Sequence, residues 1–231
     1  MTRQPRICTS ISRRVVSLAV LIVCVVVQAS AQGFLRFEAD TVPLFRGIAI
    51  ATDAVGLAQT ALSDYGQYEG ALRVNLHNQY FPTVEFGYGR ANHVDDEVTG
   101  ITYKARGPYF RVGADVNLMK RKHTGNRIYA GLRYAYTGYK VDMDRPLLTD
   151  PVWGGEAWWG VSGQKCSQHW AEVVVGIDAK VAGPLHMGWS VRYRRRLAHD
   201  DGPTEKTWYV PGFGTQGSTK LGVMYTIGID L

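Results

Sequence analysis

Cysteine is scarce in this chain of 231 residues, which contains only three. Cys8 and Cys24 lie within the first thirty residues, so a chain cleaved after that segment retains Cys166 alone. A single cysteine cannot form an intramolecular disulfide, which excludes a small secreted domain stapled by disulfides. The six histidines are scattered and show no metal-ligand spacing, so the sequence predicts neither a metal site nor a cofactor.

Long apolar runs are also missing. The longest, Val15–Val27, is shorter than the roughly 20 residues of a membrane-spanning helix, and no later stretch approaches that length. Four arginines and no acidic residue precede the run, and the small residues Ala29–Ala31 follow it. This order predicts a cleaved secretory signal peptide over residues 1–31, with Gln32 at the mature N-terminus.

Removal of the predicted signal peptide changes the charge balance. The whole chain has 26 basic and 20 acidic residues, which gives a net charge of +6. Because the segment holds four of the basic residues and none of the acidic ones, 22 remain against 20 and the net charge falls to +2. The basic balance is therefore no argument for a nucleic-acid partner, and none is predicted.

Helical periodicity is nearly absent too, since only Ala54–Leu62 has the pattern of a short helix. What recurs is strict alternation, as in Ala171–Val181, where one set of alternate residues is apolar and the other carries charge and glycine. Such alternation is typical of strands with one apolar and one polar face. The expected strands are Phe45–Val55, Glu69–Leu76, Phe81–Ala91, Tyr109–Met119, Arg127–Lys140, His169–Val181, Leu185–Leu197 and Ser218–Leu231.

The connections between these strands alternate in length. The short ones are His77–Tyr80, Lys120–Asn126 and Ala182–Pro184, and the long ones are Gly56–Tyr68, Asn92–Pro108, Val141–Gln168 and Ala198–Gly217. Short turns at one end and long loops at the other are typical of an outer-membrane barrel. The fold class expected is all-β: a closed, antiparallel, up-and-down transmembrane β-barrel of eight strands over residues 45–231. Residues 32–44 would form a periplasmic N-terminal segment.

The direction in which the charged face points decides between two kinds of barrel. A soluble lipocalin-type barrel would turn its apolar residues inward. Here the charged face mixes both signs with glycine, which inside a narrow barrel makes room for long side chains that pair across the lumen. Aromatic residues expected on the apolar face toward strand ends, as interfacial girdles, are Tyr88, Phe110, Tyr136, Trp170, Trp189 and Tyr193. The predicted lumen polar network comprises Arg73, Glu85, Arg111, Asp115, Arg133, Glu172, Asp178, Lys180, Arg192, Arg194, Lys220 and Asp230.

In its alternating strands, its connection lengths and its charged inner face, the sequence resembles small eight-stranded outer-membrane barrels of the OmpA-like type across essentially the whole mature chain. The stretches Leu62–Leu76 and Tyr80–Gly89 resemble more specifically an uncharacterised barrel family of Bacteroidota, which offers no catalytic motif. One departure from the barrel pattern is the last residue, since such barrels usually end in an aromatic residue and this chain ends in Leu231.

No catalytic arrangement is predicted, and we expect the protein not to be an enzyme. Small-barrel lipid deacylases use a histidine and a serine close together on one strand, and none of the six histidines is followed two residues later by serine. His186 and Ser190 share the inward parity, but the spacing favours a place for His186 in the interior polar network. The glycine-rich segment Gly212–Gly217 lacks the strand–helix context of a phosphate-binding loop and is expected to be a loop.

The densest charge lies in Arg192–Arg196. Parity directs Arg192, Arg194 and Arg196 inward, whereas Arg195 faces outward as a candidate contact to lipid headgroups. The inward arginines would either pair with lumen carboxylates or help to bind lipopolysaccharide, since arginine suits carboxylate and phosphate alike.

The predicted loop Val141–Gln168 is longer than a connection requires. It carries Trp153, Trp158 and Trp159 among acidic residues. Tryptophan is enriched where proteins bind one another, so these residues form a candidate partner loop. The alternative is that they fold over the mouth of the barrel.

Two functions remain open from the sequence. In the first, a filled barrel exported to the outer membrane serves as a structural or interaction subunit, with outer-membrane lipid, lipopolysaccharide and other outer-membrane proteins as its partners. In the second, a small gated barrel binds or passes a hydrophobic or charged small molecule. Eight strands leave an interior only wide enough for side chains, which argues against a general porin.

Overall fold

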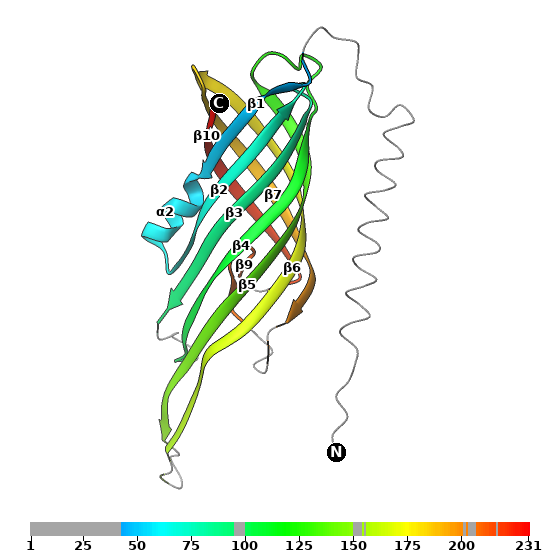
Figure 1. Ribbon diagram of the computed structural model, residues 1–231. Helices are drawn as coiled ribbons and strands as arrows, with labels where there is room; N and C mark the ends of the chain where they lie inside the picture. The colour runs from blue at the N-terminus through cyan, green and yellow to red at the C-terminus, as the bar shows by residue number, and fades with distance from the viewer. Residues whose placement is uncertain are drawn as a thin grey trace, which may run out of the picture. The chain divides into compact units, whose positions relative to one another are not determined.

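The computed structural model describes residues 43–94, 100–149, 154, 156–200, 202, 207–215 and 217–231. The predicted signal peptide and residues 32–42 lie outside the described residues. Eight antiparallel strands are hydrogen-bonded in a closed ring in the order β1-β10-β7-β6-β5-β4-β3-β2 (Figure 1). No helix in the described part of the chain is long and apolar enough to cross a membrane.

The ring confirms the predicted fold class and the up-and-down order of the strands. The eight strands are β1 (Phe45–Asp53), β2 (Tyr65–Leu76), β3 (Tyr80–His93), β4 (Thr102–Asn117), β5 (Arg127–Thr149), β6 (Glu156–Ala182), β7 (Leu185–Asp200) and β10 (Thr219–Asp230). Two further strands, β8 (Tyr209–Val210) and β9 (Gly214–Thr215), pair only with each other and belong to the connection between β7 and β10.

The alternation of β6 separates the two faces as predicted. Val175 and Ile177 are 50% and 54% exposed on the outer wall, whereas Glu172 and Asp178 are 1% and 6% exposed inside. One residue was assigned to the wrong face. Trp170 is fully buried and shares the inward parity of Glu172, so the prediction that it belongs to an outer aromatic girdle is wrong.

The short connections gather at one end of the barrel, which we call the turn end. The turn from β2 to β3 has three residues, His77, Asn78 and Gln79; the first two have positive φ, and Gln79 N donates to Leu76 O. Two central residues of positive φ suit the twist of a hairpin, and asparagine tolerates that conformation well. The C-terminal residue lies at the same end, where Leu231 N donates to Ile48 O and joins β10 to β1.

The opposite end, which we call the hairpin end, carries a long projection (Figure 1). Strands β5 and β6 stay paired from the barrel wall out to Thr149 and Glu156, and they extend well beyond the other strands. The prediction that Val141–Gln168 is a loop is therefore wrong for residues 141–149 and 156–168. Trp153 lies outside the described residues, and Trp158 and Trp159 lie on β6 with side chains that the structure does not describe.

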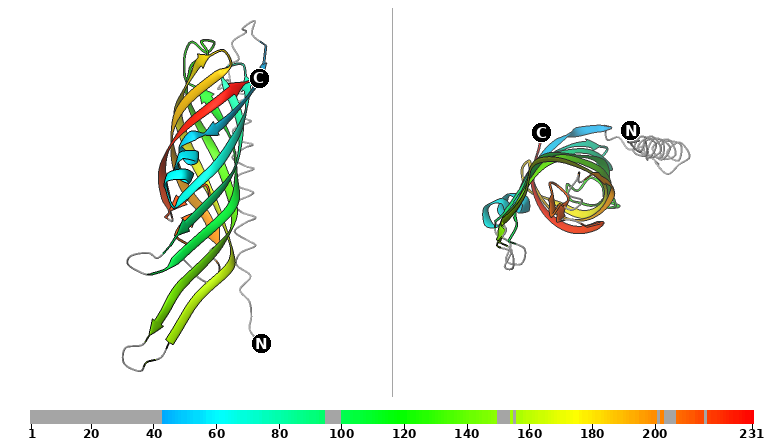
Figure 2. Two further views of the ribbon diagram at one scale, coloured as in Figure 1. Left: turned by 90° about the vertical axis from the view of Figure 1, so that its left-hand side faces the viewer. Right: turned by 90° about the horizontal axis from the view of Figure 1, so that it is seen from below.

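Strand β1 is short, so it closes the ring over only part of the length of its neighbours β2 and β10. It pairs with β10 only from Ala49 to Asp53, so β10 residues 219–225 and β2 residues 65–69 have no β1 partner. Helix α2 (Ala54–Leu62), predicted with the same bounds, follows β1, contacts both β2 and β10, and lies outside the ring (Figure 2).

Two local features hold α2 in place. The Asp53 carboxylate accepts a hydrogen bond from Val55 N at 3.0 Å and so caps the first turn. At Gly66 an added Cβ would lie 2.2 Å from Thr60 Oγ1, so glycine permits the close approach of helix and strand.

The first prediction concerns the packing of the inner face. A Cβ at Gly176 would lie 2.7 Å from both Trp189 O and the ring of Tyr129, so Gly176→Val should overfill the lumen. We expect a loss of about 1–3 kcal/mol in the free energy of unfolding, measured by urea titration of the refolded barrel. The matched control is Ala179→Val on the exposed face of the same strand. Equal unfolding midpoints for the two variants would contradict the inward assignment of Gly176.

Candidate functional site

The middle of the lumen is filled by eight charged side chains, which we call the central charge cluster. It contains four arginines and four carboxylates, so its formal charge is zero. All eight side chains are at most 9% exposed. Its members are Arg111, Arg133, Arg192, Arg194, Glu69, Glu85, Asp115 and Glu172.

Arg111 connects the cluster across the barrel. Its Nη1 donates to Glu69 Oε2 and, at 3.1 Å, to Glu85 Oε2, while its Nε lies 3.0 Å from Glu172 Oε1. These carboxylates come from strands β2, β3 and β6. One guanidinium thus joins three other strands, and the buried charge is matched by donors and acceptors at several points.

Glu85 is the second centre of the cluster. Arg192 donates to it through two nitrogens, at 2.6 and 3.0 Å, and Arg133 Nε donates to it at 3.3 Å. Arg133 also places two nitrogens 2.8 and 2.9 Å from the two oxygens of Asp115. Two-nitrogen contacts of this kind fix both the distance and the orientation of the pair.

Apolar and aromatic side chains close the lumen on the hairpin-end side of this cluster. Tyr209, Val210 and Phe213, from the connection that contains β8 and β9, are at most 2% exposed, and we call them the aromatic plug. They pack with inward residues of the barrel wall, namely Tyr103, Tyr109, Tyr139 and Trp170. Viewed along the barrel axis, this connection enters the ring (Figure 2).

The plug is fastened to the charge cluster by its own backbone. Arg111 Nη2 donates to Gly212 O at 2.8 Å, and Arg194 Nη1 donates to Phe213 O at 2.9 Å. The φ of Gly212 is +78°, and a Cβ there would lie 2.6 Å from the ring of Tyr109, so both the conformation and the space require glycine. The segment expected to be a plain loop is therefore part of the interior.

The turn-end side of the lumen has a different charge pattern. Arg73 Nη1 and Arg127 Nη2 both donate to Asp178 Oδ2, at 3.1 and 2.5 Å. His186 lies beside them, with Nε2 2.5 Å from Asp230 Oδ2 and Nδ1 3.6 Å from Asp178 Oδ1. Two arginines therefore share one carboxylate oxygen, whereas the central charge cluster has one carboxylate for each arginine.

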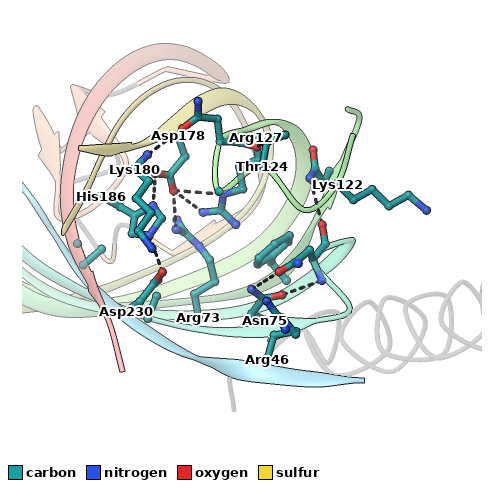
Figure 3. A pocket seen from close by; sticks show the side chains of 18 of the residues that line it. Arg46, Arg73, Asn75, Lys122, Thr124, Arg127, Asp178, Lys180, His186 and Asp230 are labelled. Carbon is teal, nitrogen blue, oxygen red and sulfur yellow. Dashed lines mark hydrogen bonds and ion pairs between the residues drawn. The ribbon is translucent and has the colours of Figure 1, made fainter. Parts of the chain in front are cut away.

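A pocket of about 310 Å³ occupies this end of the lumen, and we call it the turn-end pocket (Figure 3). Arg73, Arg127 and Asp178 line it from the barrel wall, and Lys122 and Thr124 line it from the connection between β4 and β5. The amide side chains Asn75, Asn78, Asn117 and Asn126 also contribute to the lining.

The structure brings together nine of the twelve residues predicted for the lumen network: Arg73, Glu85, Arg111, Asp115, Arg133, Glu172, Asp178, Arg192 and Arg194. The other three lie nearer the ends. Lys180 is exposed at the turn-end pocket, the Asp230 side chain is 50% exposed, and Lys220 Nζ donates to Thr215 Oγ1 in the plug connection. Arg195 lies exposed on the outer wall.

Sequence reasoning missed two charged residues of the lumen. Glu69 was placed at the first residue of a strand that in fact begins at Tyr65, and Arg127 was likewise taken as a strand end. Parity would have found both, because Glu69 shares its inward face with Arg73, and Arg127 shares its face with Arg133. No group of three histidine, cysteine or carboxylate side chains that could hold a metal ion occurs among the described residues.

Fold and interior together define a small eight-stranded β-barrel with a charge-filled lumen, the architecture of small outer-membrane barrels. The chain belongs to the family described as Domain of unknown function (DUF6048), whose model matches residues 11–230. No curated protein matches it in sequence.

Several solved barrels are similar to the chain in structure. A major outer membrane protein from Thermus thermophilus is 10% identical, with a TM-score of 0.46 over 80% of this chain and 98% of that one. CarO2 from Acinetobacter baumannii is 11% identical, with a TM-score of 0.41 over 83% and 100%. The N-terminal β-barrel domain of Pseudomonas aeruginosa OprF is 10% identical, with a TM-score of 0.40 over 81% and 99%.

The second prediction concerns the charge balance of the cluster. Arg111→Met leaves four buried carboxylates facing three arginines, and breaking a buried ion pair costs about 3–5 kcal/mol. We expect a loss of that size in the free energy of unfolding in urea, and partial recovery when Glu69→Gln is added, because the balance is restored. Arg195→Met, which removes the same charge from the outer wall, should change stability by less than about 0.5 kcal/mol. A double variant no more stable than Arg111→Met would contradict the role of balance.

Proposed function

We propose that the protein is an outer-membrane anchor: a closed, non-catalytic barrel that holds the β5–β6 hairpin outside the cell to contact a partner. The observation that carries the proposal is the contrast between the two sides of one wall. The outer face is apolar and exposed, whereas the inner face is charged, buried and internally paired.

The outer face supports a place in lipid. Large apolar side chains stand exposed on every strand of the ring, for example Val84 at 52%, Leu132 at 67% and Leu221 at 66%. Soluble monomers rarely expose contiguous apolar surface of this extent. Helix α2 adds nine residues without a charge, and the groove between α2 and the wall is lined by Ala54, Val55, Ala58, Leu62, Trp189 and Tyr225, with Gln59 and Ser63.

The connection lengths support an orientation. In outer-membrane barrels the short turns are periplasmic and the long connections extracellular, which places the turn end in the periplasm and the β5–β6 hairpin outside. Arg195 is exposed beside Leu197 and Tyr193 toward the hairpin end of β7. In this orientation it faces the headgroups of the outer leaflet, where a guanidinium can bind lipopolysaccharide phosphate.

The filled lumen favours an anchor over a pore. The central charge cluster leaves none of its carboxylates without an arginine, and the aromatic plug closes the lumen on its hairpin-end side. Opening a path would require the separation of buried, mutually paired charges, which is costly in a low-dielectric interior. The alternative role is a small barrel that handles a small molecule. Only the turn-end pocket supports it, and this pocket favours binding of a small molecule over its passage through the barrel.

The projecting hairpin supports the choice of a partner-binding role. Its strands stay paired well beyond the ends of the other strands, out to Thr149 and Glu156 (Figure 1). Two tryptophans of the predicted partner loop, Trp158 and Trp159, lie near the start of β6 in the outer part of this hairpin, and Trp153 falls between β5 and β6 in the sequence. A protein partner in the outer membrane or at the cell surface fits this position, since buried aromatic anchors carry much of the energy of protein interfaces.

The third prediction tests the closed lumen. The refolded barrel inserted in a planar lipid bilayer should produce no steady current of the size expected for an open pore. The reason is that the central charge cluster and the aromatic plug fill the cross-section of the lumen. A porin inserted under the same conditions provides the positive control. A stable open level that scales with the concentration of the electrolyte would overturn the anchor role.

The fourth prediction tests the hairpin. If Trp153, Trp158 and Trp159 bind a partner, their joint replacement by serine should remove proteins that co-purify from native membranes in mild detergent. The barrel itself should keep its heat-modifiable gel mobility. Loss of barrel stability with retention of the partners would show instead that these residues cover the mouth.

A further inference from the structure

The turn-end pocket has a charge excess that its own residues do not neutralise. Five cationic side chains line it, and two carboxylates, Asp178 and Asp230, face them, which leaves a formal excess of three positive charges. The cations are Arg46, Arg73, Lys122, Arg127 and Lys180. The central charge cluster beside it has no such excess, so the imbalance is a local property of the pocket.

At the wall of the pocket two buried arginines share a single carboxylate, Asp178. Arg127 Nε and Nη2 and Arg73 Nη1 all use the same oxygen of Asp178, at 3.2, 2.5 and 3.1 Å. The next carboxylate, Asp115, is 4.0 Å from Arg73 Nε, and its two oxygens lie 2.8 and 2.9 Å from nitrogens of Arg133. Arg127 Nη1 is buried and has no hydrogen-bond partner among the described residues.

Among the described residues no further buried carboxylate pairs with these two arginines, and the second oxygen of Asp178 lies 3.6 Å from His186 Nδ1. Asp53 is buried as well, but its oxygens accept from Val55 N and Gln67 Nε2 at the start of α2, and it forms no ion pair with a described residue. A buried guanidinium nitrogen without an acceptor is costly, and the cost is removed when an anion binds there. The shortage therefore points to a ligand.

We propose that the turn-end pocket binds a small water-soluble molecule that carries a carboxylate or phosphate group, with the anion on Arg127 and Arg73. The volume of about 310 Å³ is at the lower end of small-molecule pockets, which suits a ligand of one or two sugar-like or amino-acid-like units. Asn126 lines the same space at its exposed rim and offers its amide nitrogen to the hydroxyl or amide groups of such a ligand.

The surroundings favour a soluble ligand over a lipid headgroup. The pocket lies within the ring, so the strands separate it from the apolar outer wall on which acyl chains would rest. It also ends blindly, because the central charge cluster closes it toward the hairpin end. The site therefore binds from the turn-end side and releases to that side. This inference goes beyond the anchor role and does not require that the hairpin bind a partner.

The test is calorimetric titration of the refolded full barrel in detergent with inorganic phosphate and with citrate, against chloride at the same ionic strength. Both probes should bind better than chloride. Arg127→Gln should weaken their binding about tenfold or more, since a charge-assisted contact is lost. Arg127→Gln leaves Arg73 and His186 on Asp178, so folding should survive. Arg106→Gln removes the same charge from the exposed face of β4 and should leave binding unchanged.

A second variant keeps the test decisive if Arg127→Gln does not fold. Asn126→Asp is isosteric, lies at the exposed rim and retains the oxygen that accepts from Lys180 N, while it adds a negative charge that should weaken both probes. Binding of phosphate and citrate no tighter than chloride, or unchanged in these variants, would overturn the proposal. Competition by phosphatidylglycerol in nanodiscs would overturn the choice of a soluble ligand.

Discussion

The desolvation of charge inside a narrow barrel is the constraint on which the rest of the structure depends. A ring of eight strands has no room for bulk water in its middle, so every charged side chain that points inward must find an opposite charge or a dipole. Arg111 meets this demand with carboxylates from three strands and a backbone carbonyl of the plug. The positions of these strands and of the plug are therefore set by one side chain as much as by the sheet.

The same constraint explains how the interior changes along the barrel axis. Toward the hairpin end, where the aromatic plug fills the lumen, charge gives way to apolar packing around Trp170 and Phe213. Toward the turn end the lumen opens into a pocket whose lining has an excess of positive charge. The lumen is thus closed at the hairpin end, neutral in formal charge in the middle, and open and polar at the turn end. This order fits the two proposed roles: a barrel that supports its hairpin at one end and binds a small anion at the other.

Much of this barrel could be predicted from the sequence, because a wall between lipid and a polar interior imposes alternation residue by residue. Alternation weakens where that wall ends. Beyond Met143, the last described residue of β5 that packs in the interior, the hairpin leaves the barrel, so the pattern that identified β5 and β6 fades although the pairing continues. The plug has no period at all, because the burial of Phe213 depends on Arg111 and Arg194, which are distant in sequence. Trp170 was assigned to the outer face because tryptophan is typical of interfacial girdles. Its alternation with Ala171 would have placed it on the inner face, where it lies.

The central claim is that the apolar face meets lipid while the charged face encloses a filled lumen. Spin labels at Val175→Cys and Thr226→Cys, each in a Cys166→Ala background and in lipid bilayers, test it most directly. Val175 stands on the outer wall and Thr226 lines the turn-end pocket. The account predicts that oxygen dissolved in lipid relaxes the label at 175, whereas a water-soluble nickel chelate relaxes the label at 226. Relaxation of the label at 175 by the chelate, with protection of 226, would contradict it.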